Sequence, residues 1–147
     1  MKVFTFLLMF FSSFISAQNS DESLIKATVN GLFEGMQTSD SSKISNAFTK
    51  NAILQTITKT GEAKTENIKN FATSISKAEK GSLEERIVFS NILIDGKLAS
   101  VWTPYEFFYQ GKFSHCGVNS FQLIKINTEW KIQYIIDTRR KDQCVKK

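Results

Sequence analysis

The only histidine of the chain, His115, lies where a carboxylate can reach it. Glu106 precedes it across Gln110-Gly111, a dipeptide typical of a tight hairpin turn. If the two strands pair directly from this turn, residues equidistant from it face each other, and Glu106 lies opposite His115. A carboxylate opposite an imidazole raises the imidazole pKa and fixes its tautomer. Such a pair suits a general acid–base group, an anchor for a ligand or a structural hydrogen bond, and the sequence leaves all three open.

Cys116 follows His115 directly, which raises the question of nucleophilic or metal chemistry. Neighbouring residues of a strand point to opposite faces, so these two side chains are not expected to act as a catalytic pair. Together with Cys144 they lack the paired spacing of a zinc site. The chain also has no phosphate-binding glycine loop and no serine-nucleophile elbow. We therefore predict no metal and no cofactor.

The elements that must position these residues follow from the hydrophobic pattern. Apolar residues four apart over 24–36 predict a helix that begins at Ser20. Asp40 is the expected cap of a short second helix, and Thr65 the expected start of a third. The β-rich runs are 52–58, 83–94, 98–109, 113–126 and 130–138. This order predicts an α+β fold, with three N-terminal helices on one face of a mostly antiparallel sheet.

Register arithmetic on the two last hairpins predicts which side chains share a face. The more apolar face should turn toward the helices, with Phe121 opposite Tyr134 and Leu123 opposite Ile132. Asp137 falls on the other face, in a surface ion pair with Arg139. A β-bulge in either hairpin would exchange part of this assignment. The candidate ligand contacts on the apolar face are Trp102, Glu106, Phe108, His115, Asn119, Phe121 and Tyr134.

The N-terminus has the pattern of a secretory signal peptide. Lys2 precedes an apolar run at 3–14, and small residues end at Ala17, where we expect cleavage. This leaves one domain, residues 18–147, with no later stretch long enough to span a membrane. We therefore expect a secreted or periplasmic protein. In such an oxidising setting Cys116 and Cys144 are expected to form a disulfide, because the register places residue 139 opposite Cys116 and the tail has only to fold back.

The net charge of +5 does not point to nucleic acid. The basic residues gather at the C-terminus, in 139–141 and 146–147, and no basic face is interleaved with aromatic residues. We expect these residues to be solvated. No nucleic-acid partner is predicted.

Several short segments resemble the nuclear transport factor 2-like superfamily, and within it the small exported branch labelled putative lumazine-binding. The resemblance covers residues 21–142. It implies a cystatin-like cone, in which a strongly curved sheet wraps around three helices and leaves a pocket at its wide end. It also implies a homodimer that pairs through the sheet. The segments that carry it are Leu98–Trp102, Tyr105–Phe107, Gly111-Lys112, His115–Gly117, Phe121–Leu123 and Trp130–Ile132.

The expected function is binding of a small apolar or aromatic ligand in this pocket, oriented by the few polar residues of the apolar face. Two alternatives stay open, because a fold does not choose an activity. One is a lyase- or isomerase-type enzyme with His115 as acid–base, oriented by Glu106. The other is a structural or partner-binding module whose interface consists of outward-facing aromatics, Tyr105, Phe107 and Tyr109.

Overall fold

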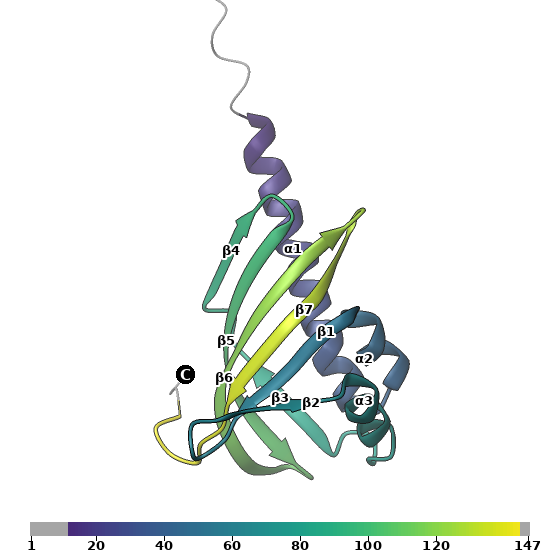
Figure 1. The fold of residues 1–147 in the computed structure, drawn as a ribbon, viewed down its shortest axis with the longest axis vertical. Helices are drawn as coiled ribbons and strands as arrows, with labels where there is room; N and C mark the ends of the chain where they lie inside the picture. The colour runs from purple at the N-terminus through teal and green to yellow at the C-terminus, as the bar shows by residue number, and fades with distance from the viewer. Residues whose placement is uncertain (1–11, 145–147) are drawn as a thin grey trace, which may run out of the picture.

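The computed structural model describes residues 12–144, with side chains from residue 21 onward. The helices in this range pack on one side of a single sheet (Figure 1), which confirms the α+β prediction. Residues 1–11, most of the expected signal peptide, lie outside the described range. The elements are α1 (Ser12–Gln37), α2 (Ser41–Ala47), β1 (Phe48–Ile57), β2 (Ala63–Glu66), α3 (Ile68–Ser76), β3 (Leu83–Ile87), β4 (Asn91–Asp95), β5 (Leu98–Tyr109), β6 (Lys112–Ile126) and β7 (Glu129–Thr138).

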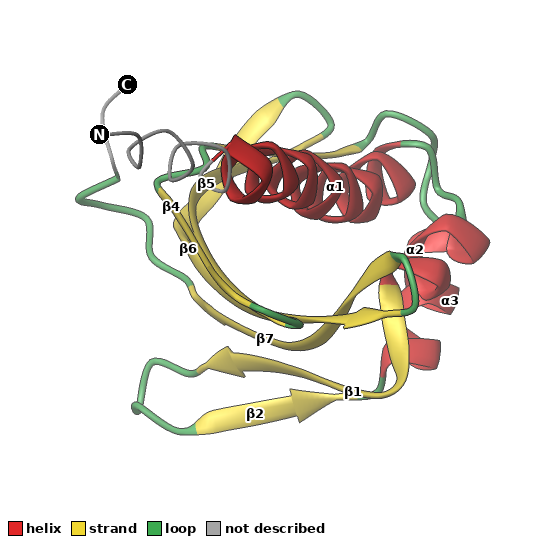
Figure 2. Ribbon diagram, turned by 90° about the horizontal axis from the view of Figure 1, so that it is seen from above, coloured by secondary structure: helices red, strands yellow, loops and turns green. Residues whose placement is uncertain are grey.

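The sheet is mixed but mostly antiparallel. Its strand order is β2-β1-β7-β6-β5-β3, and β4 also pairs with β5. Only β1 and β7 run parallel among these pairs. Seen from above, the sheet curls around α1, which lies in its hollow (Figure 2). The predicted curved sheet wrapped around helices is confirmed.

A bulge in the β5–β6 hairpin changes the predicted register. Tyr109 pairs with Lys112 as expected, but Ser114 is an extra residue, so His115 pairs with Phe107. The predicted pairing of Glu106 with His115 is therefore wrong. Strand side chains alternate between the two faces, so one extra residue changes which residues share a face. Beyond the bulge, each β5 residue therefore lies on the same face as a β6 residue one position further along than predicted.

A second bulge lies between β6 and β7. Leu123 pairs with Ile132 as predicted. Gln133 is then an extra residue, so Phe121 pairs with Ile135 rather than with Tyr134. Tyr134 thus turns to the outer face, while the residues after it exchange faces as well.

The predicted strand over 83–94 is two strands. Residues 88–90 separate β3 from β4 and lie opposite Thr103 and Pro104 of β5. Three residues face two at this point, and Pro104 has no N–H to donate to the ladder. The interruption therefore follows from the proline on the neighbouring strand.

Two helix starts differ from the prediction, and one is confirmed. α1 already begins at Ser12, not at Ser20, since no proline or glycine interrupts 12–20. Asp40 caps α2 as expected, accepting a hydrogen bond from Lys43 N at 2.9 Å. α3 begins at Ile68 after its cap Asn67, because the preceding residues pair with β1 as β2. No helix in the described part of the chain is long and apolar enough to cross a membrane.

The core lies between α1 and the concave face of the sheet. Buried apolar residues of α1 pack on buried residues of β6 and β7, and the rings of Phe33 and Phe121 meet edge to face. Asp21 fixes the helix to the sheet: its carboxylate is 2.5 Å from Lys125 Nζ and accepts a hydrogen bond from Trp130 Nε1 at 3.1 Å. These contacts hold α1 across the hollow.

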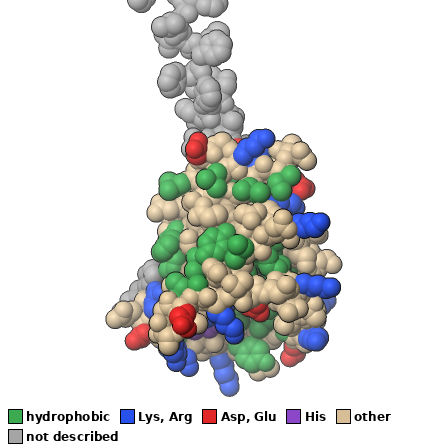
Figure 3. Space-filling view, viewed as in Figure 1, with side chains coloured by type: hydrophobic (Ala, Val, Ile, Leu, Met, Phe, Trp, Pro, Cys, Tyr) green, Lys and Arg blue, Asp and Glu red, His purple; other side chains and the backbone are tan. Residues whose placement is uncertain are grey.

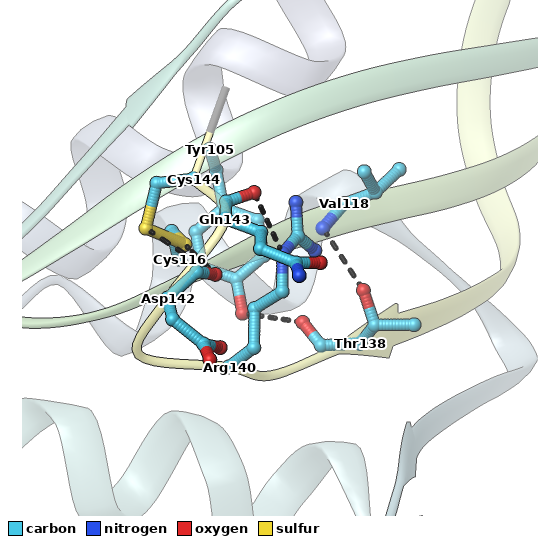
Figure 4. Close-up of a disulfide and its surroundings, with 8 residues drawn as sticks. All are labelled: Tyr105, Cys116, Val118, Thr138, Arg140, Asp142, Gln143 and Cys144. Carbon is cyan, nitrogen blue, oxygen red and sulfur yellow. Dashed lines mark hydrogen bonds between the residues drawn. A yellow bond between two sulfur atoms is a disulfide. The ribbon is translucent and has the colours of Figure 1, made fainter. Parts of the chain in front are cut away.

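Cys116 and Cys144 form a disulfide, as predicted (Figure 4). Cys116 also exchanges two backbone hydrogen bonds of 2.9 Å with Arg140. The residue opposite Cys116 is therefore Arg140 and not Arg139, because the bulge at Gln133 shifts the register of β6 and β7 by one. The disulfide attaches the C-terminal tail to the middle of β6.

Loss of this disulfide should lower the free energy of unfolding. Cys144→Ser releases a loop closed over a sequence separation of 28, and the chain-entropy model puts the cost at about 3 to 4 kcal/mol. Urea unfolding followed by circular dichroism measures the difference. Wild-type protein in dithiothreitol is the control and should match the variant. A variant as stable as the oxidised wild type would contradict this expectation.

Candidate functional site

A cavity of about 290 Å³ lies between the helices and the concave face of the sheet. Its walls are mostly apolar, and its polar groups come from the sheet and from Ser74 of α3. Nearly every element contributes, so the cavity is a product of the whole fold. The lining residues are Leu32, Phe33, Met36, Phe48, Leu54, Glu66, Phe71, Ser74, Ile75, Glu85, Tyr105, Phe107, His115, Asn119, Ile135, Asp137 and Arg139.

Asp137 is the centre of one polar cluster and is only 6% exposed. Thr56 Oγ1 donates to its Oδ1, and Arg139 Nε donates to its Oδ2 at 2.8 Å. Arg139 Nη2 also donates to Thr56 Oγ1 at 3.0 Å. The Tyr105 hydroxyl lies 3.2 Å from Asp137 Oδ2 and 2.9 Å from the backbone oxygen of Thr138. The carboxylate is thus compensated by one cation and by neutral donors.

Gly117 allows Tyr105 to reach this cluster. A Cβ at residue 117 would lie 1.8 Å from the Thr138 backbone oxygen and 2.8 Å from Cε1 of Tyr105. Only a residue without a side chain therefore lets the Tyr105 ring cross β6 and place its hydroxyl at β7.

Glu85 and Asn119 form a second polar group. Asn119 Nδ2 donates to Glu85 Oε1 at 2.8 Å and lies 3.4 Å from Thr103 Oγ1. Burial raises the pKa of Glu85 to about 7, and the nearby charge of Asp137 adds to this. The Asn119 hydrogen bond and the charge of Arg139 act in the opposite direction. Glu85 is therefore close to half-ionised at neutral pH.

His115 lies among aromatic rings and faces no carboxylate of β5. Its ring centroid is 5.0 Å from that of Phe107 and 5.7 Å from that of Tyr105, the latter perpendicular. Its Nδ1 is 3.1 Å from Ser114 Oγ. Burial lowers the pKa of His115, and the positive charge of Arg139 lowers it further. The imidazole is therefore neutral at pH 7, the opposite of what the predicted pair with Glu106 implied.

The structure brings together only part of the predicted ligand set. His115 and Asn119 line the cavity, and Phe121 is buried in the core behind it. The four remaining residues lie on the outer face. Trp102, Glu106 and Tyr134 lie beyond a bulge, which exchanges their faces, and Phe108 precedes the bulge and lies outside together with its partner Phe113. The predicted position of these four residues in the cavity is wrong.

Conversely, some residues that were predicted to lie on the outer face lie inside. Tyr105 and Phe107, expected outside, line the cavity, and the Asp137–Arg139 pair is at its wall rather than on the outer surface. Glu85 was not singled out at all. A signal existed for it: Leu83, Glu85 and Ile87 alternate along one strand, so a charge stands where an inward apolar residue is expected. No comparable local signal marks Asp137.

Among the described residues, no group of three His, Cys, Asp or Glu side chains is arranged to hold a metal ion. Asp137 and Glu85 instead have hydrogen-bond donors as partners. The arrangement offers an apolar hollow with three carboxyl groups, a guanidinium, an amide and an imidazole. Chemically, this is a site for recognition by shape and hydrogen bonding.

The comparisons with known proteins agree with this fold. A family model described as putative lumazine-binding matches residues 20–134. No curated protein matches the chain in sequence. Among solved structures, the chain is similar to a nuclear transport factor 2-like protein of unknown function from Shewanella baltica OS155, with a TM-score of 0.69 at 18% identity over 84% of this chain and 97% of that one.

Two further solved structures extend the likeness. One is a nuclear transport factor 2-like protein of unknown function from Silicibacter pomeroyi DSS-3, with a TM-score of 0.69 at 15% identity over 84% of this chain and 98% of that one. The other is a putative scytalone dehydratase from Novosphingobium aromaticivorans DSM 12444, with a TM-score of 0.68 at 13% identity over 90% of this chain and 93% of that one. At these identities the likeness shows the fold alone.

The burial of Glu85 should make stability depend on pH. The folded pKa of Glu85, about 7, exceeds its ordinary value of 4.5, so the folded state binds more protons between these values and its stability declines as pH rises through them. Glu85→Gln keeps an acceptor for Asn119 and removes the charge. We expect the variant to gain about 2 kcal/mol over wild type between pH 4.5 and pH 8, less than full burial would give because the cavity admits water.

Urea unfolding at the two pH values measures this difference. Glu106→Gln is the matched control, since it removes a carboxylate from the outer face of the neighbouring strand. It should show no comparable rise. If the effect of Glu85→Gln is the same at pH 4.5 and pH 8, the carboxylate is not desolvated.

Proposed function

We propose that this chain, which belongs to the putative lumazine-binding family, binds a small, partly apolar ligand in the cavity between α1, α3 and the concave face of the sheet. The observation that carries the proposal is the combination of mostly apolar walls with polar groups in one cavity. His115 and Asn119 orient the ligand, and Glu85 contributes a carboxyl group beside them. Such an arrangement is typical of small-molecule sites.

The size of the cavity supports a compact ligand. A volume of about 290 Å³ is at the lower end of the range for small-molecule pockets. Aromatic side chains line its walls, including Phe71 of α3 and Phe107 of β5. A flat compound of one or two rings suits these walls.

The state of the polar groups favours binding over turnover. Both oxygens of Asp137 are engaged by donors, and His115 has no carboxylate to orient it. The acid–base pair on which the alternative of a lyase or isomerase depended is not formed. Binding needs only the positions that these groups already occupy.

Occupancy of the cavity can be tested by closing its mouth. Ser74 is exposed on α3 and lines the cavity, so Ser74→Trp should block entry without disturbing the core. The probes are lumazine and the neutral compound indole-3-propionamide, titrated calorimetrically. We expect one-to-one binding of at least one probe, weakened about ten-fold or more in the variant.

Thr73→Trp is the matched control, because Thr73 is also exposed on α3 but does not line the cavity. It should bind as wild type does. The proposal fails if neither probe binds, or if Ser74→Trp binds as tightly as Thr73→Trp.

We place this binding function outside the cytoplasm. The disulfide between Cys116 and Cys144 is typical of an oxidising environment. The sequence of residues 1–17 supports export through a signal peptide cleaved after Ala17. Together they favour a secreted or periplasmic ligand-binding protein.

We also propose that two copies pair through the outer face of the sheet. Trp102, Ser120 and Ile136 lie side by side there on β5, β6 and β7. Trp102 is 48% exposed, and apolar side chains gather in the middle of this face (Figure 3). An exposed apolar patch without charge favours association with a second apolar surface.

Trp102→Glu should therefore convert a dimer to a monomer in sedimentation velocity at micromolar concentration, because the pairing would bury two unpaired carboxylates. Leu24→Glu is the control, since Leu24 is an exposed apolar residue of α1. It should leave the dimer intact. A monomeric wild type at this concentration would rule out the pairing.

A further inference from the structure

The charges around the cavity have a sign opposite to that of the whole chain. The chain carries a net charge of +5. The cavity, however, is lined by three carboxyl groups, those of Glu66, Glu85 and Asp137, against one guanidinium, that of Arg139. Because solvent screens surface charges beyond about 10 Å, the nearby carboxylates dominate the field that a ligand meets inside.

Arg139 is already paired with groups of the protein. Its Nε donates to Asp137 Oδ2 at 2.8 Å, and its Nη2 donates to Thr56 Oγ1 at 3.0 Å. These contacts use the guanidinium to compensate Asp137. The imidazole of His115 is neutral at pH 7, so it offers no second positive charge.

Glu66 and Glu85 are the carboxyl groups of the cavity that take part in no ion pair among the described residues, and Glu85 is the less exposed of the two. Its hydrogen bond comes from the amide of Asn119, at 2.8 Å, and none of the ion pairs in the described residues includes it. A neutral donor compensates a buried carboxylate only in part. A ligand that brings a positive charge to Glu85 would complete the compensation.

The aromatic walls favour the same kind of ligand. Tyr105 and Phe107 line the cavity together with Glu85, and the faces of aromatic rings attract cations. We propose that the cavity selects an apolar organic cation, a protonated amine on a one- or two-ring body, whose ammonium group pairs with Glu85. This inference rests on the proposed function, since it names the chemical class of the ligand that the cavity binds.

Three probes of matched shape test the sign of the charge. Tryptamine, indole-3-propionamide and indole-3-propionate share one ring system and carry a cationic, a neutral and an anionic end. At pH 8, where Glu85 is ionised, calorimetry should show tryptamine binding about ten-fold or more tightly than the amide, and the propionate more weakly than the amide.

Glu85→Gln assigns the effect to its carboxylate. The variant should lose the preference, bringing tryptamine to within about two-fold of the amide. Circular dichroism shows whether the variant is folded. Glu106→Gln, which removes a carboxylate from the outer face, should keep the full preference for tryptamine.

The results distinguish failure of the cation selectivity from failure of the binding function. If the amide or the propionate binds as tightly as tryptamine, the cation selectivity is overturned and the binding function stands. The same holds if Glu85→Gln keeps the preference for tryptamine. If none of the three probes binds while lumazine does, this inference is overturned and the binding function stands. If lumazine does not bind either, both are overturned.

Discussion

One extra residue, Ser114, determines which side chains of β5 face the helices. Strand side chains alternate between two faces, so a single inserted residue exchanges the faces of all the residues beyond it. With this bulge, Tyr105 and Phe107 turn into the hollow and Glu106 turns out. A hairpin without it would put the opposite set inside. The chemistry of the cavity therefore depends on a local feature of the backbone more than on the composition of the strands.

The second bulge, at Gln133, brings Asp137 inside, and the rest of the site compensates for that. A buried carboxylate is costly unless donors surround it. The parallel pairing of β1 with β7 places Thr56 beside Asp137, and Gly117 leaves room for the Tyr105 hydroxyl to reach it. Asp137 is thereby paired with a cation, whereas the hydrogen bond that Glu85 receives among the described residues comes from the neutral amide of Asn119. Asp137 and Glu85 have different roles because their partners differ.

The sequence predicted what depends on periodicity and on tight turns. The helical stripe of α1, the cap at Asp40 and the pairing of Leu123 with Ile132 all follow from local patterns, and all are confirmed. The order of elements is confirmed except for β2, which was not predicted, and for the strand over 83–94, which is β3 and β4. Bulges carry no such pattern, since Ser114 and Gln133 are ordinary strand residues. Trp102, Glu106 and Tyr134 lie beyond one of them, counted from the turn. His115 and Asn119 were placed together correctly because β6 alternates regularly from His115 onward.

The C-terminal tail connects the disulfide with the charge balance of the cavity. Arg139 stands between the end of β7 and Arg140, whose backbone pairs with Cys116. The disulfide to Cys144 holds this tail against β6, so the Arg139 backbone is fixed on both sides. If the tail were free, the guanidinium would lose entropy on reaching Asp137 and would pair with it less often. Asp137 would then compete with Glu85 for a cationic ligand. The cross-link thus keeps one carboxylate occupied, and this leaves Glu85 as the group that a ligand can meet.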